Sequence, residues 1–190
     1  IETIDQWILT KLSNTITEAT KALDEYEYSK AKMIIEQFFW HDFCDNYLEL
    51  VKTRLYEPKE NKQKESAQYA LRTCLLAVLK LMASFTPFIT EELYHKYFHA
   101  TEGAKSLHLI SWPEEPEVNT KSEAIGDVVV AILGAVRKKK TEAKLSMKAP
   151  VQKLVIETKT EITSALSDLQ ATTCAQEITF GTAKEEIKEG

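Results

Sequence analysis

Basic side chains are concentrated in one short stretch of the sequence, residues 136–153. They are Arg137, Lys138, Lys139, Lys140, Lys144, Lys148 and Lys153. Only Glu142 opposes them, although the whole chain carries 29 Asp and Glu against 24 Lys and Arg. Such a local density of cations attracts a polyanion, for example a nucleic-acid backbone. The alternative is the solvated end of a helix, where cations suit the negative end of the helix dipole.

Two histidines have a spacing that suits a metal ion. His95 and His99 lie four residues apart, and Glu91 and Glu92 precede them by one turn. A zinc site needs three or four ligands, and no further His, Cys or Asp lies nearby in the sequence to complete one. The motifs G-x-x-x-x-G-K-[ST], G-x-S-x-G and H-E-x-x-H are also absent. We therefore predict no catalytic residue, cofactor or metal within the chain.

The three cysteines, Cys44, Cys74 and Cys174, are odd in number and far apart. This pattern suits neither a disulfide framework nor a zinc knuckle, so it predicts reduced thiols in a cytoplasmic protein. No apolar run reaches the roughly 18–20 residues that a membrane span needs, and no signal peptide is evident. We therefore expect no membrane partner.

An aromatic run occupies residues 38–43, Phe-Phe-Trp-His-Asp-Phe. Consecutive helical positions point in different directions, so these rings cannot all face one core. Packing among several helices is one interpretation of the run. The other is a platform on which the bases of single-stranded RNA stack.

Long helices must position these residues, because glycine is absent from residues 1–102 and proline occurs there only at 58 and 87. Apolar residues recur every third or fourth position in five segments. The predicted helices are 4–23, 29–55, 66–85, 89–98 and 121–140. The connection over 99–118 is long enough to have a role of its own or to pack back on the body.

The pattern changes after Pro150. Residues 151–157 alternate as a strand does, 160–170 read as a short helix and 177–180 as a second strand, with 183–190 frayed. The predicted fold is mainly α, an antiparallel bundle of four or five helices followed by a small α+β appendage. We place the bundle in residues 1–148 and the appendage in 149–190.

Four blocks of sequence then carry a family resemblance. They are D-x-W-I-L-x-K-L at 5–12, F-F-W-x-D-F-C-D-x-Y-L-E-L-V-K at 38–52, P-F-I-T-E-E-L-Y at 87–94 and S-L-H-L-x-x-W-P at 106–113. In this order they resemble the anticodon-binding helical domain of class I aminoacyl-tRNA synthetases of the valine, isoleucine and leucine group. The block over 43–52 is most similar to valyl-tRNA synthetases, with the isoleucine and leucine enzymes as the alternative. The resemblance covers about residues 1–157.

The resemblance implies a part of a tRNA ligase. In such enzymes a separate catalytic domain activates the amino acid with ATP and Mg²⁺ and joins it to the 3′ end of tRNA. The family's catalytic signatures, a His-Ile-Gly-His-like motif and a KMSKS loop, do not occur here. The run Lys144–Lys148 is similar to KMSKS only superficially, because it follows the bundle whereas the family's loop precedes it. The implied partners are a tRNA, by resemblance valine tRNA, and a catalytic domain in the same chain, with this fragment monomeric.

Two groups of residues are candidates for contact with tRNA. The first is Gln6, Trp7 and Lys11, because the family's bundle presents an aromatic residue around the Asp5-x-Trp7 position. The equal alternative is that Trp7 anchors the core. The second group would touch the phosphate backbone, which gives affinity without sequence information. It consists of Arg137, Lys138, Lys139, Lys140 and Lys144.

Four further polar residues end the second predicted helix. Tyr47, Glu49, Lys52 and Arg54 are expected to be mostly structural, with Glu49 paired with a neighbour. Two other function classes stay open at this point. A helical protein–protein module would use the aromatic run as its partner groove and would expose a large apolar patch. A free-standing enzyme would need a deep pocket with converging titratable groups.

Overall fold

The first helix, α1, spans Thr3–Asp24 in the computed structural model, which describes residues 1–181. Ile4, Ile8 and Leu12 follow the helical period and are fully buried. The helix ends just before Tyr26, whose φ of 59° lies in the left-handed region, which does not continue a helix. The helix predicted over 4–23 is confirmed.

The second long helix has three parts, α2 (Tyr28–Gln37), a π-helical segment (Phe38–Tyr47) and α3 (Leu48–Leu55). We predicted an uninterrupted α-helix over 29–55, and its middle is instead wound more widely. The Leu48 amide donates to the carbonyl of Phe43, five residues back. The wide turn stacks the rings of Phe38 and Phe43, whose centroids lie 6.3 Å apart, in the core. Trp40 is 61% exposed, so the aromatic run is divided between core and surface.

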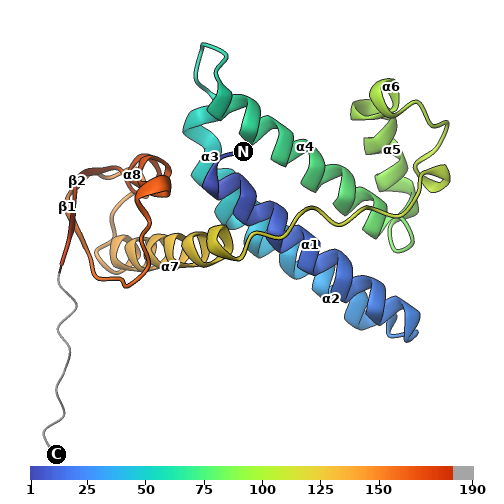
Figure 1. The fold of residues 1–190 in the computed structure, drawn as a ribbon, viewed down its shortest axis with the longest axis horizontal. Coiled ribbons are helices and arrows are strands. Elements are labelled where there is room, and N and C mark those ends of the chain that lie inside the picture. The colour runs from blue at the N-terminus through green and yellow to red at the C-terminus, as the bar shows by residue number, and fades with distance from the viewer. Residues whose placement is uncertain (182–190) are drawn as a thin grey trace, which may run out of the picture.

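Helices α4 (Lys62–Met82), α5 (Pro87–Tyr97) and α6 (His99–Glu102) follow, and α5 and α6 lie at the far end of α4 (Figure 1). α4 begins four residues before the predicted start at 66. The cause is Asn61, whose side chain accepts a 2.9 Å hydrogen bond from the Lys64 amide and caps the helix. Pro87 opens α5, where its missing N–H costs no helical hydrogen bond.

The connection after α6 starts with a 3₁₀ turn, Leu107–Leu109, and then crosses α1 in extended form (Figure 1). The Trp112 indole N–H donates to the Thr20 hydroxyl at 2.9 Å, and the Asn119 amide donates to the Thr10 hydroxyl at 3.1 Å. The connection therefore packs back on the body, as one of the two expectations held. It delivers the chain to α7 (Thr120–Glu142), which lies against α1.

The appendage consists of β1 (Val151–Ile156), a 3₁₀ turn (Thr163–Ala165), α8 (Leu166–Thr173) and β2 (Ala175–Phe180). The two strands pair in parallel, from Val151 opposite Ala175 to Ile156 opposite Phe180. α8 makes the crossover that a parallel pair requires, and Cys174 ends it with a φ of 57°. The predicted fraying of 183–190 lies outside the described residues.

One hydrophobic core joins the bundle and the appendage. Ile156, Ile162, Ala165 and Leu169 of the appendage are buried in the same cluster as the α1 and α7 side chains. The fold class, a mainly α bundle followed by a small α+β appendage, is confirmed. The division at 148/149 stays a prediction. None of the helices within residues 1–181 is long and apolar enough to cross a membrane.

Candidate nucleic-acid interface

The basic residues of the predicted backbone-binding group have two different environments. Lys138, Lys139 and Lys144 are exposed at and just beyond the end of α7. No carboxylate of residues 1–181 forms an ion pair with any of them. These three cations are therefore free to meet an anion from outside the chain. The two remaining members, Arg137 and Lys140, are held by the protein itself.

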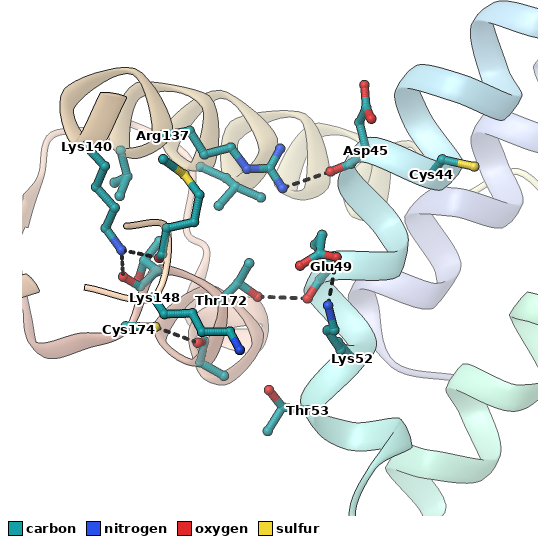
Figure 2. Close-up of a pocket in the computed structure, with 15 residues that line it drawn as sticks. Cys44, Asp45, Glu49, Lys52, Thr53, Arg137, Lys140, Lys148, Thr172 and Cys174 are labelled. Carbon is teal, nitrogen blue, oxygen red and sulfur yellow. Dashed lines mark hydrogen bonds and ion pairs between the residues drawn. The ribbon is translucent and has the colours of Figure 1, made fainter. Parts of the chain in front are cut away.

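Arg137 braces α7 against the π-helical segment. Its Nη1 donates to Asn46 Oδ1 at 3.1 Å. Its Nη2 donates to the carbonyl oxygen of Asp45 at 2.8 Å, as Figure 2 shows. Both acceptors are uncharged, so the guanidinium keeps its full positive charge uncompensated by them. The side chain is half-buried and faces a groove between the bundle and the appendage.

Lys140 is 5% exposed, so it is not the surface contact that we predicted. Its Nζ donates to the carbonyl oxygens of Met147, at 2.8 Å, and Thr173, at 2.9 Å (Figure 2). The ammonium thereby ties the loop after α7 to the end of α8. The sequence does contain the signal, because Lys140 continues the helical spacing of the buried residues Leu133 and Val136.

Trp7 lies in the core with 1% of its surface exposed. Its indole N–H donates to Asp127 Oδ1 at 2.9 Å, and its ring packs on Gly126 of α7 so closely that a Cβ at position 126 would overlap it. A ring with no free face offers nothing for a base to stack on. The structure therefore favours the interpretation of Trp7 as a core anchor.

Lys11 and Gln6 also make their polar contacts within the chain. The Lys11 ammonium lies 3.2 Å from the Glu123 carboxylate and 3.0 Å from that of Asp127. Partial burial lowers the pKa of Lys11, but these two carboxylates outweigh that effect and leave the pKa raised. The Gln6 amide donates to the Glu117 carbonyl oxygen at 3.0 Å. Gln6, Trp7 and Lys11 thus contact the start of α7 and the segment before it. The exposed lysines lie at the opposite end of α7 and just beyond it.

The sequence did not reveal how deeply Asp5 is buried. Its carboxylate is fully buried and accepts hydrogen bonds from the Tyr47 hydroxyl at 2.7 Å, from both Arg54 Nη atoms at 2.9 Å and from the Ser66 hydroxyl at 2.5 Å. Desolvation raises the pKa of Tyr47, and the Asp5 charge adds to that rise. The expected structural role of Tyr47 and Arg54 agrees with this network, and Glu49 pairs with Lys52 at 3.0 Å as predicted.

The same arginine links the bundle to the appendage. Arg54 Nε lies 3.0 Å from Asp168 Oδ1 of α8, although the angle does not satisfy a hydrogen bond. Burial raises the pKa of Asp168 to about 6, against the lowering influence of Arg54 and with a further rise from the Asp5 charge. The Arg54 guanidinium therefore contacts two carboxylates. Both of its terminal nitrogens donate to Asp5, and only Nε faces Asp168.

The two histidines form no ligand set with their neighbours. His95 Nε2 lies 3.0 Å from Glu91 Oε1, and the rings of His95 and His99 are 5.0 Å apart. Within residues 1–181 no group of three or more His, Cys, Asp or Glu side chains is arranged to hold a metal ion. The three cysteines are unpaired, and Cys74 is fully buried.

A groove of about 600 Å³ separates the appendage from the second long helix (Figure 2). Arg137, Lys140 and Lys148 line it from α7 and the appendage side. Asp45, Glu49 and Lys52 line it from the π-helical segment and α3. Leu133, Val136, Met147 and Ala171 add apolar surface. The groove is thus cationic on one wall, mixed on the other, and apolar between them.

Residues 5–156 match the family model described as the anticodon-binding domain of tRNA ligase. The chain belongs to this family. The match includes the α1–α7 contact, the basic end of α7 and strand β1.

Curated relatives of this anticodon-binding domain are valine–tRNA ligases. The protein from Methanothermobacter thermautotrophicus is 38% identical over 98% of this chain, and that from Ehrlichia ruminantium is 42% identical over 93%. The Wolbachia pipientis relative is likewise 42% identical over 93% of the chain. The chain spans about a fifth of the length of each relative, 21–22%. These matches do not favour the isoleucine and leucine alternatives or the protein–protein module.

Proposed function

We propose that this domain binds tRNA, with the exposed lysines at the end of α7 contacting the phosphate backbone. The observation that carries the proposal is the lack of any ion-pair partner for Lys138, Lys139 and Lys144 within residues 1–181. Three neighbouring unpaired cations in a chain of net charge −5 are suited to an external polyanion. Membership of the anticodon-binding family supplies the kind of nucleic acid.

Phosphate contacts give affinity but do not distinguish one tRNA from another. Reading of the anticodon needs groups that reach the edges or faces of unstacked bases. Gln6, Trp7 and Lys11 are not in the proposed interface, because their polar atoms and the Trp7 ring are used between α1 and its neighbours. Discrimination is therefore assigned to a surface other than the α1–α7 contact.

We further propose that the longer protein joins valine to its tRNA, since the relatives are valine–tRNA ligases. ATP and Mg²⁺ would act in a catalytic domain outside these 190 residues. The domain would act as a monomer in the cytoplasm and hold the tRNA while that reaction proceeds.

The test is equilibrium binding of the 190-residue chain to three transcripts at two salt concentrations. The transcripts are valine tRNA, isoleucine tRNA and valine tRNA with a replaced anticodon. The proposal predicts binding that weakens with salt and is tightest for the intact valine tRNA. Equal salt-sensitive binding to all three would limit the domain to backbone contact, and absence of binding at low salt would contradict the proposal.

A further inference from the structure

We infer that the groove between the appendage and the second long helix binds a single nucleotide unit of a single-stranded RNA segment. The inference rests on the proposed function, because it places part of the tRNA that the exposed lysines attract. It concerns different residues, namely Arg137, Lys140 and Lys148, which line the groove. The phosphate would lie toward these cations and the base along the apolar surface.

The first support is a buried cation that no carboxylate neutralises. Lys140 is 5% exposed, and its two hydrogen bonds go to the carbonyl oxygens of Met147 and Thr173. An ammonium has three N–H donors, so one remains without an acceptor among residues 1–181. Burial of an unpaired charge is unfavourable, and an anion in the adjoining groove would relieve it.

The second support is that the neighbouring cations are also uncompensated. Arg137 donates only to the amide oxygen of Asn46 and the backbone of Asp45, and Lys148 is exposed without an ion pair in residues 1–181. Two acidic residues line the opposite wall. Figure 2 shows the Asp45 carboxylate pointing away from Arg137, and Glu49 is paired with Lys52 at 3.0 Å. The charged residues that line the groove therefore carry a net positive charge, with four cations against two carboxylates.

The third support is the size and shape of the groove. Its volume of about 600 Å³ falls within the roughly 300–1,000 Å³ of sites that hold small ligands. Leu133, Val136 and Met147 give an apolar surface on which the face of a base can rest. The two walls are joined by a hydrogen bond from the Thr172 hydroxyl to the Glu49 carbonyl oxygen at 3.3 Å, so the groove suits a single unstacked nucleotide better than a duplex.

The fourth support is continuity with the surface already proposed for backbone contact. Lys144 and Lys148 belong to the same short loop between α7 and β1, and Lys144 is one of the three exposed lysines of the proposed interface. An RNA strand that follows the lysines from the end of α7 is led along this loop to the groove. This path favours a phosphodiester over a small free anion.

Two half-buried thiols provide the test. Cys174 lines the groove on the appendage side and Cys44 lines its opposite wall, where Figure 2 shows the Cys44 sulfur turned away from the groove. Alkylation of both by iodoacetamide would be followed by mass spectrometry, with and without an RNA hairpin that carries the valine anticodon loop. With the hairpin at ten times its Kd the groove is vacant for about a tenth of the time, so labelling of Cys174 slows about tenfold, whereas labelling of Cys44, whose sulfur is turned outward, slows less.

A pair of matched variants separates the groove from the surface lysines. Lys148→Gln removes one groove cation, and Lys159→Gln removes an exposed appendage lysine that does not line the groove. We expect Lys148→Gln to weaken hairpin binding, to lower its salt slope by about one and to reduce the protection of Cys174, with Lys159→Gln unchanged.

The outcomes are distinguishable from failure of the proposed function. Bound hairpin without protection of Cys174 overturns the groove and leaves tRNA binding in place. Absence of hairpin binding by the unaltered chain overturns both.

Discussion

In the first half of α7, Glu123 and Asp127 pair with Lys11, and Asp127 also accepts the hydrogen bond of the Trp7 indole. In the second half, Lys138 and Lys139 face solvent with no carboxylate partner among residues 1–181. The first half of α7 therefore carries charges that are paired with α1, whereas the second half carries exposed charges without a partner among residues 1–181. The lesson is that pairing, more than residue type, separates a structural charge from one available to a ligand.

The largest effect is expected when the Trp7 ring, which packs on the first half of α7, is removed. Trp7→Ala should lower the free energy of unfolding by about 3–5 kcal/mol, because it leaves a cavity and removes the indole hydrogen bond to Asp127. The salt dependence of tRNA binding should stay unchanged. Urea unfolding and binding at two salt concentrations measure the two quantities. Trp40→Ala, which removes a ring that is 61% exposed, is the control and should cost much less.

Stability measured as a function of pH tests a second charge held inside the protein, the buried carboxyl of Asp168 in α8. Its pKa is raised from 3.8 to about 6, so the folded chain binds this proton more tightly than the unfolded chain does. The resulting stabilisation is complete below about pH 4 and is lost as the pH rises through 6, by roughly 3 kcal/mol at 1.36 kcal/mol per pKa unit. Asp168→Asn should remove this loss.

Urea unfolding from pH 4 to pH 7 measures the Asp168 contribution as the difference between the variant and the unaltered chain. Asp24→Asn, at the exposed end of α1, is the matched control and should keep the full dependence. An identical pH profile for Asp168→Asn and the unaltered chain would show that burial of this carboxyl is not coupled to folding.

The smallest effect is expected from two single lysine substitutions. Lys11 of α1 pairs with the first half of α7, and Lys138 lies in the second half. Lys11→Gln should lower the free energy of unfolding by about 0.5–1 kcal/mol, because its two ion pairs are partly exposed. Lys138→Gln should leave thermal stability unchanged and weaken tRNA binding instead. If the two variants exchanged these effects, the division of α7 into a packed half and an exposed half would be wrong.

The helices could be predicted because their causes are local. The apolar period and the positions of Pro58 and Pro87 predicted where the helices lie, whereas the Asn61 cap, which starts α4 four residues before the predicted position, was not part of the prediction. The π-helical turn was not predicted, because the helix over 29–55 was predicted from the α-helical period alone. Only the packing of Phe38 over Phe43 reveals the wider turn.

The candidate site was predictable in part. The basic cluster was visible as composition, and three of the five predicted backbone-binding residues, Lys138, Lys139 and Lys144, are exposed. Sequence alone did not separate Lys140 from them, although its spacing from Val136 marks the buried face of α7. The groove needed the structure, because Lys52, Arg137 and Cys174 meet there from distant parts of the chain.

Whether the exposed lysines of α7 contact phosphate is tested most directly by the salt slope of tRNA binding after Lys138, Lys139 and Lys144 are replaced together by Gln. A triple variant with Lys59, Lys62 and Lys159 replaced, all of them exposed and away from α7, is the matched control. We expect the plot of log K against log salt to become shallower by about 2–3 in the first variant, at about 0.7–0.9 per phosphate contact, with no change in the second. Equal slopes for both variants would contradict the proposal that Lys138, Lys139 and Lys144 contact the phosphate backbone.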